Sequence, residues 1–226
     1  MKILPLIFAL ITIITPFITQ KTGLSKKYGL QLKMLCAFLY LATGVFSAAA
    51  FGTATEYTFM VLGALVLGIL GDFFLEYKGK KLFPLGVVFF ALGHILYGLT
   101  FLFTGAYIAL PHIAAVAGIT LALTAVTVIL AKTKLRLAGK KNLLLIYVPV
   151  LVFSFACAIV RGSAALCDGN LPFGLCLISG GTLFLASDVM IGVGKGGIER
   201  PKILHNAVSY TYFAAQALFA LSILFQ

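Results

Sequence analysis

Eight long runs of apolar residues, separated by short polar segments, dominate the sequence. Each run is close to the roughly 20 residues that an α-helix needs to cross the hydrocarbon core of a bilayer. Strands of a membrane barrel would alternate in polarity over about ten residues, and no such alternation occurs here. The pattern predicts an all-α polytopic membrane protein, a bundle of eight transmembrane helices over residues 3–19, 34–52, 56–76, 82–104, 106–131, 143–160, 171–193 and 203–225.

Basic residues gather in alternate connections between these runs. The second, fourth and sixth connections hold only Arg161, whereas cytoplasmic loops are typically rich in Lys and Arg. We therefore expect odd-numbered loops in the cytoplasm and both termini outside, although Lys2 opposes this. The first run lacks a small-residue cleavage site and is interpreted as an uncleaved span. The basic residues of the odd connections are Lys21, Lys26, Lys27, Lys33, Lys78, Lys80, Lys81, Lys132, Lys134, Arg136, Lys140, Lys141, Lys195, Arg200 and Lys202.

The composition supports the same class of protein. Hydrophobic residues make up 62% of 226 positions, only 10% are charged, and the mean hydropathy is +1.11. A water-facing surface of this size would need far more polar positions. The net charge of +11 reflects the loop lysines, so nucleic acid is not an expected partner. We expect one integral domain over residues 1–226, in the inner (cell) membrane of a bacterium.

The remaining chemistry-bearing motifs are few. Four cysteines have no metal-type spacing and are expected to be free, although a bridge between Cys167 and Cys176 stays open. The sequence contains no phosphate-binding glycine loop, no HExxH and no GxSxG. Nucleotide-driven and zincin chemistry are therefore not expected, and the sequence points to no metal and no cofactor.

Two of the six acidic residues lie well inside apolar runs. At 1.5 Å per helical residue, Asp72 and Asp188 lie about 6 and 9 Å inside the cytoplasmic ends of their runs. A carboxylate in hydrocarbon costs at least about 2.5 to 3.5 kcal/mol, so we expect both to face a shared polar cavity. The alternative is that each caps a helix or bonds a hydroxyl on another span. A buried pair of this kind can divide into one protonated and one ionised carboxyl group.

Other polar residues inside the runs are candidates for the same site. His94 is expected near the middle of the bilayer, with Tyr97 one turn further on. Tyr212 and Gln216 share a helix face, and with His94 they can extend a polar column from the cytoplasmic side. For His94 and Tyr212 the alternative is a packing role. Ser187 precedes Asp188, and its hydroxyl can equally bond a backbone carbonyl.

At these residues the chain resembles the YhhN-like lysoplasmalogenase family of eight-span membrane proteins. The resemblance covers most of the chain and rests on LGILGDFFL, FFALGHILYGLTF, LFLASDVMIG and SYTYFAAQALFA. It implies hydrolysis of the vinyl ether bond of lysoplasmalogens to a fatty aldehyde and a glycerophospho-amine, with a lysophospholipid substrate taken from the membrane. The paired aspartates of the family correspond to Asp72 and Asp188, and the resemblance implies a catalytic role for both.

The residues themselves suit this chemistry, because a protonated and an ionised carboxyl group can together hydrolyse a vinyl ether. Two other classes of protein stay open. One is a metal-dependent, ceramidase-like lipid hydrolase, for which one deep His is thin support, since three ligands are usual. The other is a transporter whose aspartates relay protons.

Overall fold

The computed structural model describes residues 2–77, 82–104, 110–134, 141–195 and 202–226. Throughout these ranges the regular structure is helical and no strand occurs, which confirms the all-α fold class. Eight of the helices are long and one, α2, is a single turn. The helices are α1 (Ile3–Lys21), α2 (Leu24–Lys27), α3 (Gly29–Phe51), α4 (Glu56–Glu76), α5 (Phe83–Phe103), α6 (Leu110–Lys134), α7 (Lys141–Cys167), α8 (Leu171–Lys195) and α9 (Lys202–Ser222).

The long helices correspond one to one with the predicted spans, and two boundaries differ most. α3 begins five residues before the predicted start at residue 34, so that Lys33 lies inside the helix. α7 continues seven residues past the predicted end at residue 160, because Arg161 does not interrupt it. The turn that follows α7 contains Gly169, whose φ of 81° a glycine adopts without strain. The Asn170 N–H then bonds the Ala165 carbonyl at 2.8 Å, as in a Schellman cap.

Within the described residues, seven helices are long and apolar enough to cross a membrane. The eighth long helix, α9, has 21 residues but is not one of the seven. It packs against α1, α3, α4 and α8, so protein rather than lipid surrounds much of it. A helix in that position needs fewer apolar residues than one facing lipid. The integral multi-pass architecture stands, and the count of eight spans stays a prediction.

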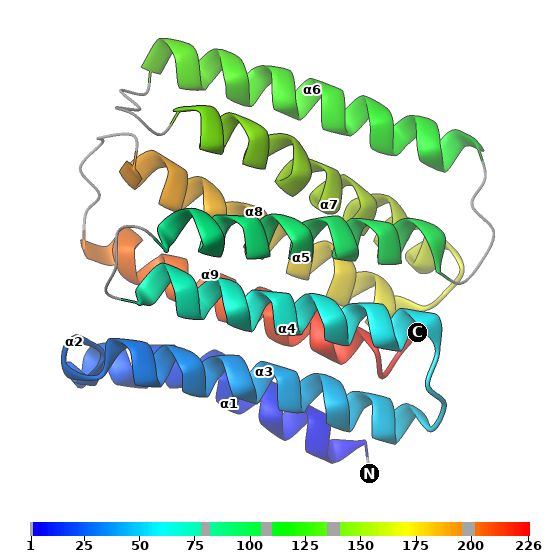
Figure 1. The fold of residues 1–226 in the computed structure, drawn as a ribbon. Helices are drawn as coiled ribbons and strands as arrows, with labels where there is room; N and C mark the ends of the chain where they lie inside the picture. The colour runs from blue at the N-terminus through cyan, green and yellow to red at the C-terminus, as the bar shows by residue number, and fades with distance from the viewer. Residues whose placement is uncertain (1, 78–81, 105–109, 135–140, 196–201) are drawn as a thin grey trace.

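The helices run side by side in one bundle, with α1 and α3 at one side and α6 at the opposite side (Figure 1). α4 and α5 pack together, as do α7 and α8, and α9 lies between α8 and the α1–α3 pair. Only 6% of the apolar segment of α6 is buried inside the protein, against 22–44% for the other six candidate spans. α6 is therefore the most peripheral of these helices. Large apolar side chains cover the outside of the bundle, as a lipid-facing surface requires.

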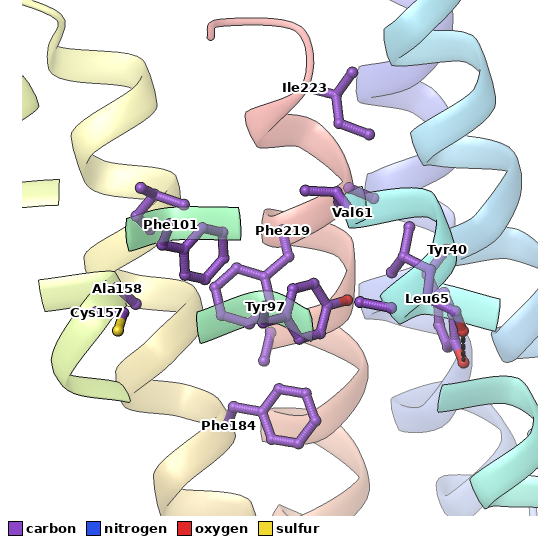
Figure 2. Close-up of a cluster of buried hydrophobic side chains, with 14 of the residues drawn as sticks. Tyr40, Val61, Leu65, Tyr97, Phe101, Cys157, Ala158, Phe184, Phe219 and Ile223 are labelled. Atoms are coloured by element: carbon purple, nitrogen blue, oxygen red, sulfur yellow. Dashed lines mark hydrogen bonds between the residues drawn. The ribbon is translucent and has the colours of Figure 1, made fainter. Parts of the chain in front are cut away.

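Aromatic rings fill the centre of the bundle (Figure 2). Phe219 of α9 packs with its ring tilted against Tyr97 and Phe101 of α5 and stacks on Phe184 of α8, with ring centroids 4.6 to 6.2 Å apart. The Tyr40 hydroxyl of α3 donates to the Leu65 carbonyl of α4 at 3.4 Å. This core fixes the helices that carry the polar side chains described next.

Candidate functional site

Asp72, in the last two turns of α4, is a buried carboxylate with a partner on each oxygen. Its side chain is 1% exposed. Lys33 Nζ of α3 lies 3.2 Å from Oδ1, and the Tyr212 hydroxyl of α9 donates to Oδ2 at 2.7 Å. Lys33 also lies 3.6 Å from Oε2 of Glu76, whose side chain is 44% exposed. Three helices thus contribute to the surroundings of this carboxylate.

Lys33, which contacts Asp72, was predicted from the sequence only as part of the basic first loop. The structure instead places it in the first turns of α3, on the same helix face as Ala37 and Tyr40, which are both fully buried. The spacing of four and seven residues from Lys33 to these two positions was the sequence signal that could have placed Lys33 on the buried face of a helix. The hydropathy pattern hid it, because a lysine at the end of an apolar run resembles a loop residue.

A chain of hydrogen bonds leads from Asp72 toward the aromatic core. The Tyr97 hydroxyl donates to Gln216 Oε1 at 2.7 Å, and Gln216 Nε2 donates to the Tyr212 oxygen at 3.1 Å. Tyr212 in turn donates to Asp72. Gln216 is fully buried, so both atoms of its amide need these partners. The structure therefore brings together four of the seven candidate residues.

Asp188 belongs to a second network, near the C-terminal end of α8. The Tyr147 hydroxyl of α7 donates to its Oδ2 at 2.5 Å, and His94 Nε2 of α5 lies 3.4 Å from the same oxygen. The Asp188 side chain is 10% exposed. Tyr147 is the second residue that sequence reasoning missed, because a tyrosine within an apolar run also occurs as a packing residue or at the membrane interface.

His94 is buried among aromatic rings and has spare hydrogen-bonding capacity. Its side chain is 2% exposed, and its ring centroid lies 4.5 Å from that of Phe184 and 5.7 Å from that of Tyr147. Neither ring nitrogen makes a hydrogen bond within the described residues, although Nε2 is within ion-pair distance of Asp188. Buried polar atoms are normally hydrogen-bonded, so His94 is a candidate functional group rather than an ordinary packing residue.

The two networks meet at one aromatic side chain. The Phe184 ring contacts His94 of the Asp188 network and Tyr212 of the Asp72 network, with the second pair of centroids 5.4 Å apart. The hydrogen bonds and ion pairs described for the two carboxylates involve different side chains. A cavity shared by both therefore stays a prediction. His94 lies beside Asp188, outside the column that links Tyr212 and Gln216.

The hydrogen bond of the Ser187 hydroxyl belongs to neither carboxylate network. Ser187 is fully buried, and its hydroxyl donates to the Val208 carbonyl of α9 at 3.3 Å. This is the backbone-bonded alternative considered for it, and it ties α8 to α9.

The remaining sequence predictions concern metal ligands, thiols and loop charges. Within the described ranges no three His, Cys, Asp or Glu side chains lie close enough together to hold a metal ion. All four cysteines are free, so Cys167 and Cys176 do not form a bridge. Several predicted cytoplasmic charges lie outside the described residues, namely Lys78, Lys80, Lys81, Arg136, Lys140 and Arg200.

These features define a helical integral membrane protein that keeps two carboxylates in buried polar networks near one end of its bundle. The chain belongs to the YhhN family, whose model matches residues 29–223. The match begins with α3 and confirms the family resemblance seen in the sequence. Comparison with curated proteins and with solved structures finds no match.

Proposed function

We propose that this protein is a membrane hydrolase that cleaves the vinyl ether bond of lysoplasmalogens, releasing a fatty aldehyde and a glycerophospho-amine. The observation that carries the proposal is the burial of Asp72, 1% exposed, in contact with Lys33 and Tyr212. Retaining such a group in apolar surroundings is costly, which favours a role in chemistry over one in packing. Membership of the YhhN family is consistent with a hydrolase.

The reaction requires only a proton donor and a negative group. A donated proton adds to the β-carbon of the vinyl ether, and the π electrons form the new C–H bond. The α-carbon and the ether oxygen then share a positive charge, as in the oxocarbenium ions of glycoside hydrolysis. Water bonds to the α-carbon and loses a proton, and the resulting hemiacetal splits into aldehyde and alcohol. The carboxyl groups of Asp72 and Asp188 can supply both requirements.

A lipid substrate also suits the depth of these residues. In a single-chain phospholipid the vinyl ether lies just below the head group. Asp72 is four residues before the end of α4 and Asp188 seven residues before the end of α8, both on the side that carries α2. At 1.5 Å per residue these positions are about 6 and about 10 Å from the helix ends. We propose that the lysophospholipid enters from the surrounding membrane.

Aldehyde release from purified protein tests the proposal. The substrate pair is a lysoplasmalogen and its saturated ether analogue, and only the first should yield aldehyde. Asp72→Asn and Asp188→Asn should each reduce release by at least about 100-fold, the usual contribution of a positioned acid or base. The matched control is Asp168→Asn, because Asp168 is exposed between α7 and α8. Full activity in either buried-site variant would remove that aspartate from the mechanism.

The same preparation separates the two alternative functions. Loss of aldehyde release after treatment with strong chelators would favour a metal-dependent hydrolase. Proton-coupled flux in liposomes without aldehyde release would favour a transporter, since an enzyme needs no gradient. Lysoplasmalogen left intact by folded wild-type protein would refute the proposed function.

A further inference from the structure

The surroundings of the two carboxylates differ in charge. Asp72 lies 3.2 Å from the ammonium group of Lys33, a group with three donors and no acceptor. Asp188 instead lies beside a tyrosine hydroxyl and an imidazole, at 2.5 and 3.4 Å. Of the ion pairs found among the described residues, those of Lys33 reach Asp72 and Glu76, and that of Asp188 involves His94.

Hydrogen-bond directions around Asp72 reinforce this difference. The Tyr212 oxygen already accepts from Gln216 Nε2, so its own proton points to Asp72 Oδ2. Lys33 donates to Oδ1. Among the described residues both oxygens of Asp72 thus lie beside donors, an arrangement that suits a carboxylate.

The other titratable groups facing Asp72 do not change the conclusion that its surroundings suit a carboxylate. Cys36 and Tyr40 face it from α3, and Glu76 lies one turn away on α4. Glu76 is 44% exposed, so water screens its charge. α5 also packs on α4, but its His94 forms an ion pair with Asp188 and its Tyr97 hydroxyl donates to Gln216.

We infer that Lys33 is a positioning residue that keeps Asp72 ionised, so that Asp72 stabilises the cationic intermediate and the proton donor is the Asp188–His94 pair. This division of roles rests on the proposed function. The Asp188 carboxyl gives its proton to the β-carbon, and Asp72 stays anionic beside the positive α-carbon. Water bonds to that carbon and releases a proton, which restores Asp188. The hemiacetal hydroxyl proton then passes to the ether oxygen as the C–O bond breaks.

Substitution of Lys33 tests the inference through kinetics. Lys33→Met should reduce kcat for aldehyde release by about 100-fold, the lower end of the loss expected when a preorganised electrostatic group is removed. The acid side of its pH profile should move toward neutral pH, because an unpaired Asp72 is protonated more readily. Lys33→Arg should restore most of the activity, since a guanidinium also pairs with a carboxylate. Lys21→Met, at the exposed end of α1, is the matched control.

Three kinetic results would overturn the inference. One is a Lys33→Met enzyme with the kcat and pH profile of the wild type. Another is a shift confined to the alkaline side of the profile, which would make Asp72 the acid. The third is a Glu76→Gln variant that reproduces Lys33→Met, because Glu76 would then be the functional partner of Lys33. Thermal unfolding of each variant in detergent identifies any loss that is due to misfolding.

Infrared difference spectra test the ionisation of Asp72 without substrate. The spectrum of wild type minus Asp72→Asn should contain a band in the carboxylate region. In a Lys33→Met background the corresponding band should lie in the carboxylic-acid region. A carboxylic-acid band in the wild type would refute the inference even if aldehyde release is confirmed. A carboxylate band in a protein that leaves lysoplasmalogen intact would refute only the proposed function.

Discussion

Gly68→Ala is expected to disrupt the hydrogen-bond chain from within α4. A Cβ at residue 68 would lie 2.6 Å from Gln216 Nε2 and 3.2 Å from the Tyr40 hydroxyl, and the first distance is too short for any carbon atom. A glutamine amide can usually move away. Gln216, however, is fully buried and held at both amide atoms by Tyr97 and Tyr212, so moving it breaks hydrogen bonds.

The size of the effect follows from three contributions. Overpacking of a tight core costs about 1 to 3 kcal/mol. Loss of one hydrogen bond between membrane helices costs about 0.6 to 1.7 kcal/mol. Replacing a glycine within a helix by alanine returns about 1 kcal/mol. The net destabilisation should therefore be about 1 to 4 kcal/mol, together with reduced aldehyde release because Tyr212 loses its orientation.

Gly93→Ala on the neighbouring helix α5 is the matched comparison. There the new Cβ would meet the Ala64 carbonyl at 3.5 Å and the Leu67 Cβ at 3.6 Å, which are ordinary contacts. This variant should be neutral or more stable by up to about 1 kcal/mol. Reversible unfolding in mixed detergent, followed by circular dichroism, measures both. Equal stability of Gly68→Ala and Gly93→Ala would refute the argument that Gln216 is held in place.

Three further predictions concern other parts of the chain. Gln216→Leu leaves the Tyr97 hydroxyl without its acceptor and removes the donor to the Tyr212 oxygen, which keeps its bond to Asp72, and should lower the unfolding free energy by about 1 to 3 kcal/mol in the same assay. Gly118→Ala on α6, where no neighbour lies within 4 Å of the new Cβ, should leave stability unchanged or raise it by up to about 1 kcal/mol. Cys167 is exposed between α7 and α8 and should react with an impermeant maleimide added to intact cells, whereas the buried thiols should react only after denaturation. Labelling of Cys167 only in inverted membranes would reverse the predicted orientation.

The sequence predicted the helices well because hydropathy acts locally. A run of about 20 apolar residues is enough to identify a helix that can cross the bilayer, without knowledge of its neighbours. Boundaries were less secure where a charge lies inside a helix. Arg161 and Lys33 both looked like loop residues, yet each continues a helix, since backbone pairing within the helix is independent of the side chain.

The site was only partly predictable, because its contacts depend on how helices pack. Asp72, Tyr212 and Gln216 were identified as unusual polar residues, and the structure joins them in one chain of hydrogen bonds. The ion pair between Lys33 and Asp72 joins α3 to α4, and no local pattern states which residues face each other across two helices. For the same reason the contact between His94 and Asp188 could not be read from their positions in the sequence.

The weak hydropathy of α9 and the position of the site have a common cause. A helix in contact with α1, α3, α4 and α8 exposes little surface to lipid, so it can carry polar side chains on several faces. α9 accordingly supplies Tyr212 and Gln216 to the Asp72 network and the Val208 carbonyl to Ser187. Its Ala215, Ala217 and Ala220 are buried and small enough to let neighbouring helices approach. The low hydropathy of a span is therefore a sequence signal for the helix that lies inside the bundle and carries polar chemistry.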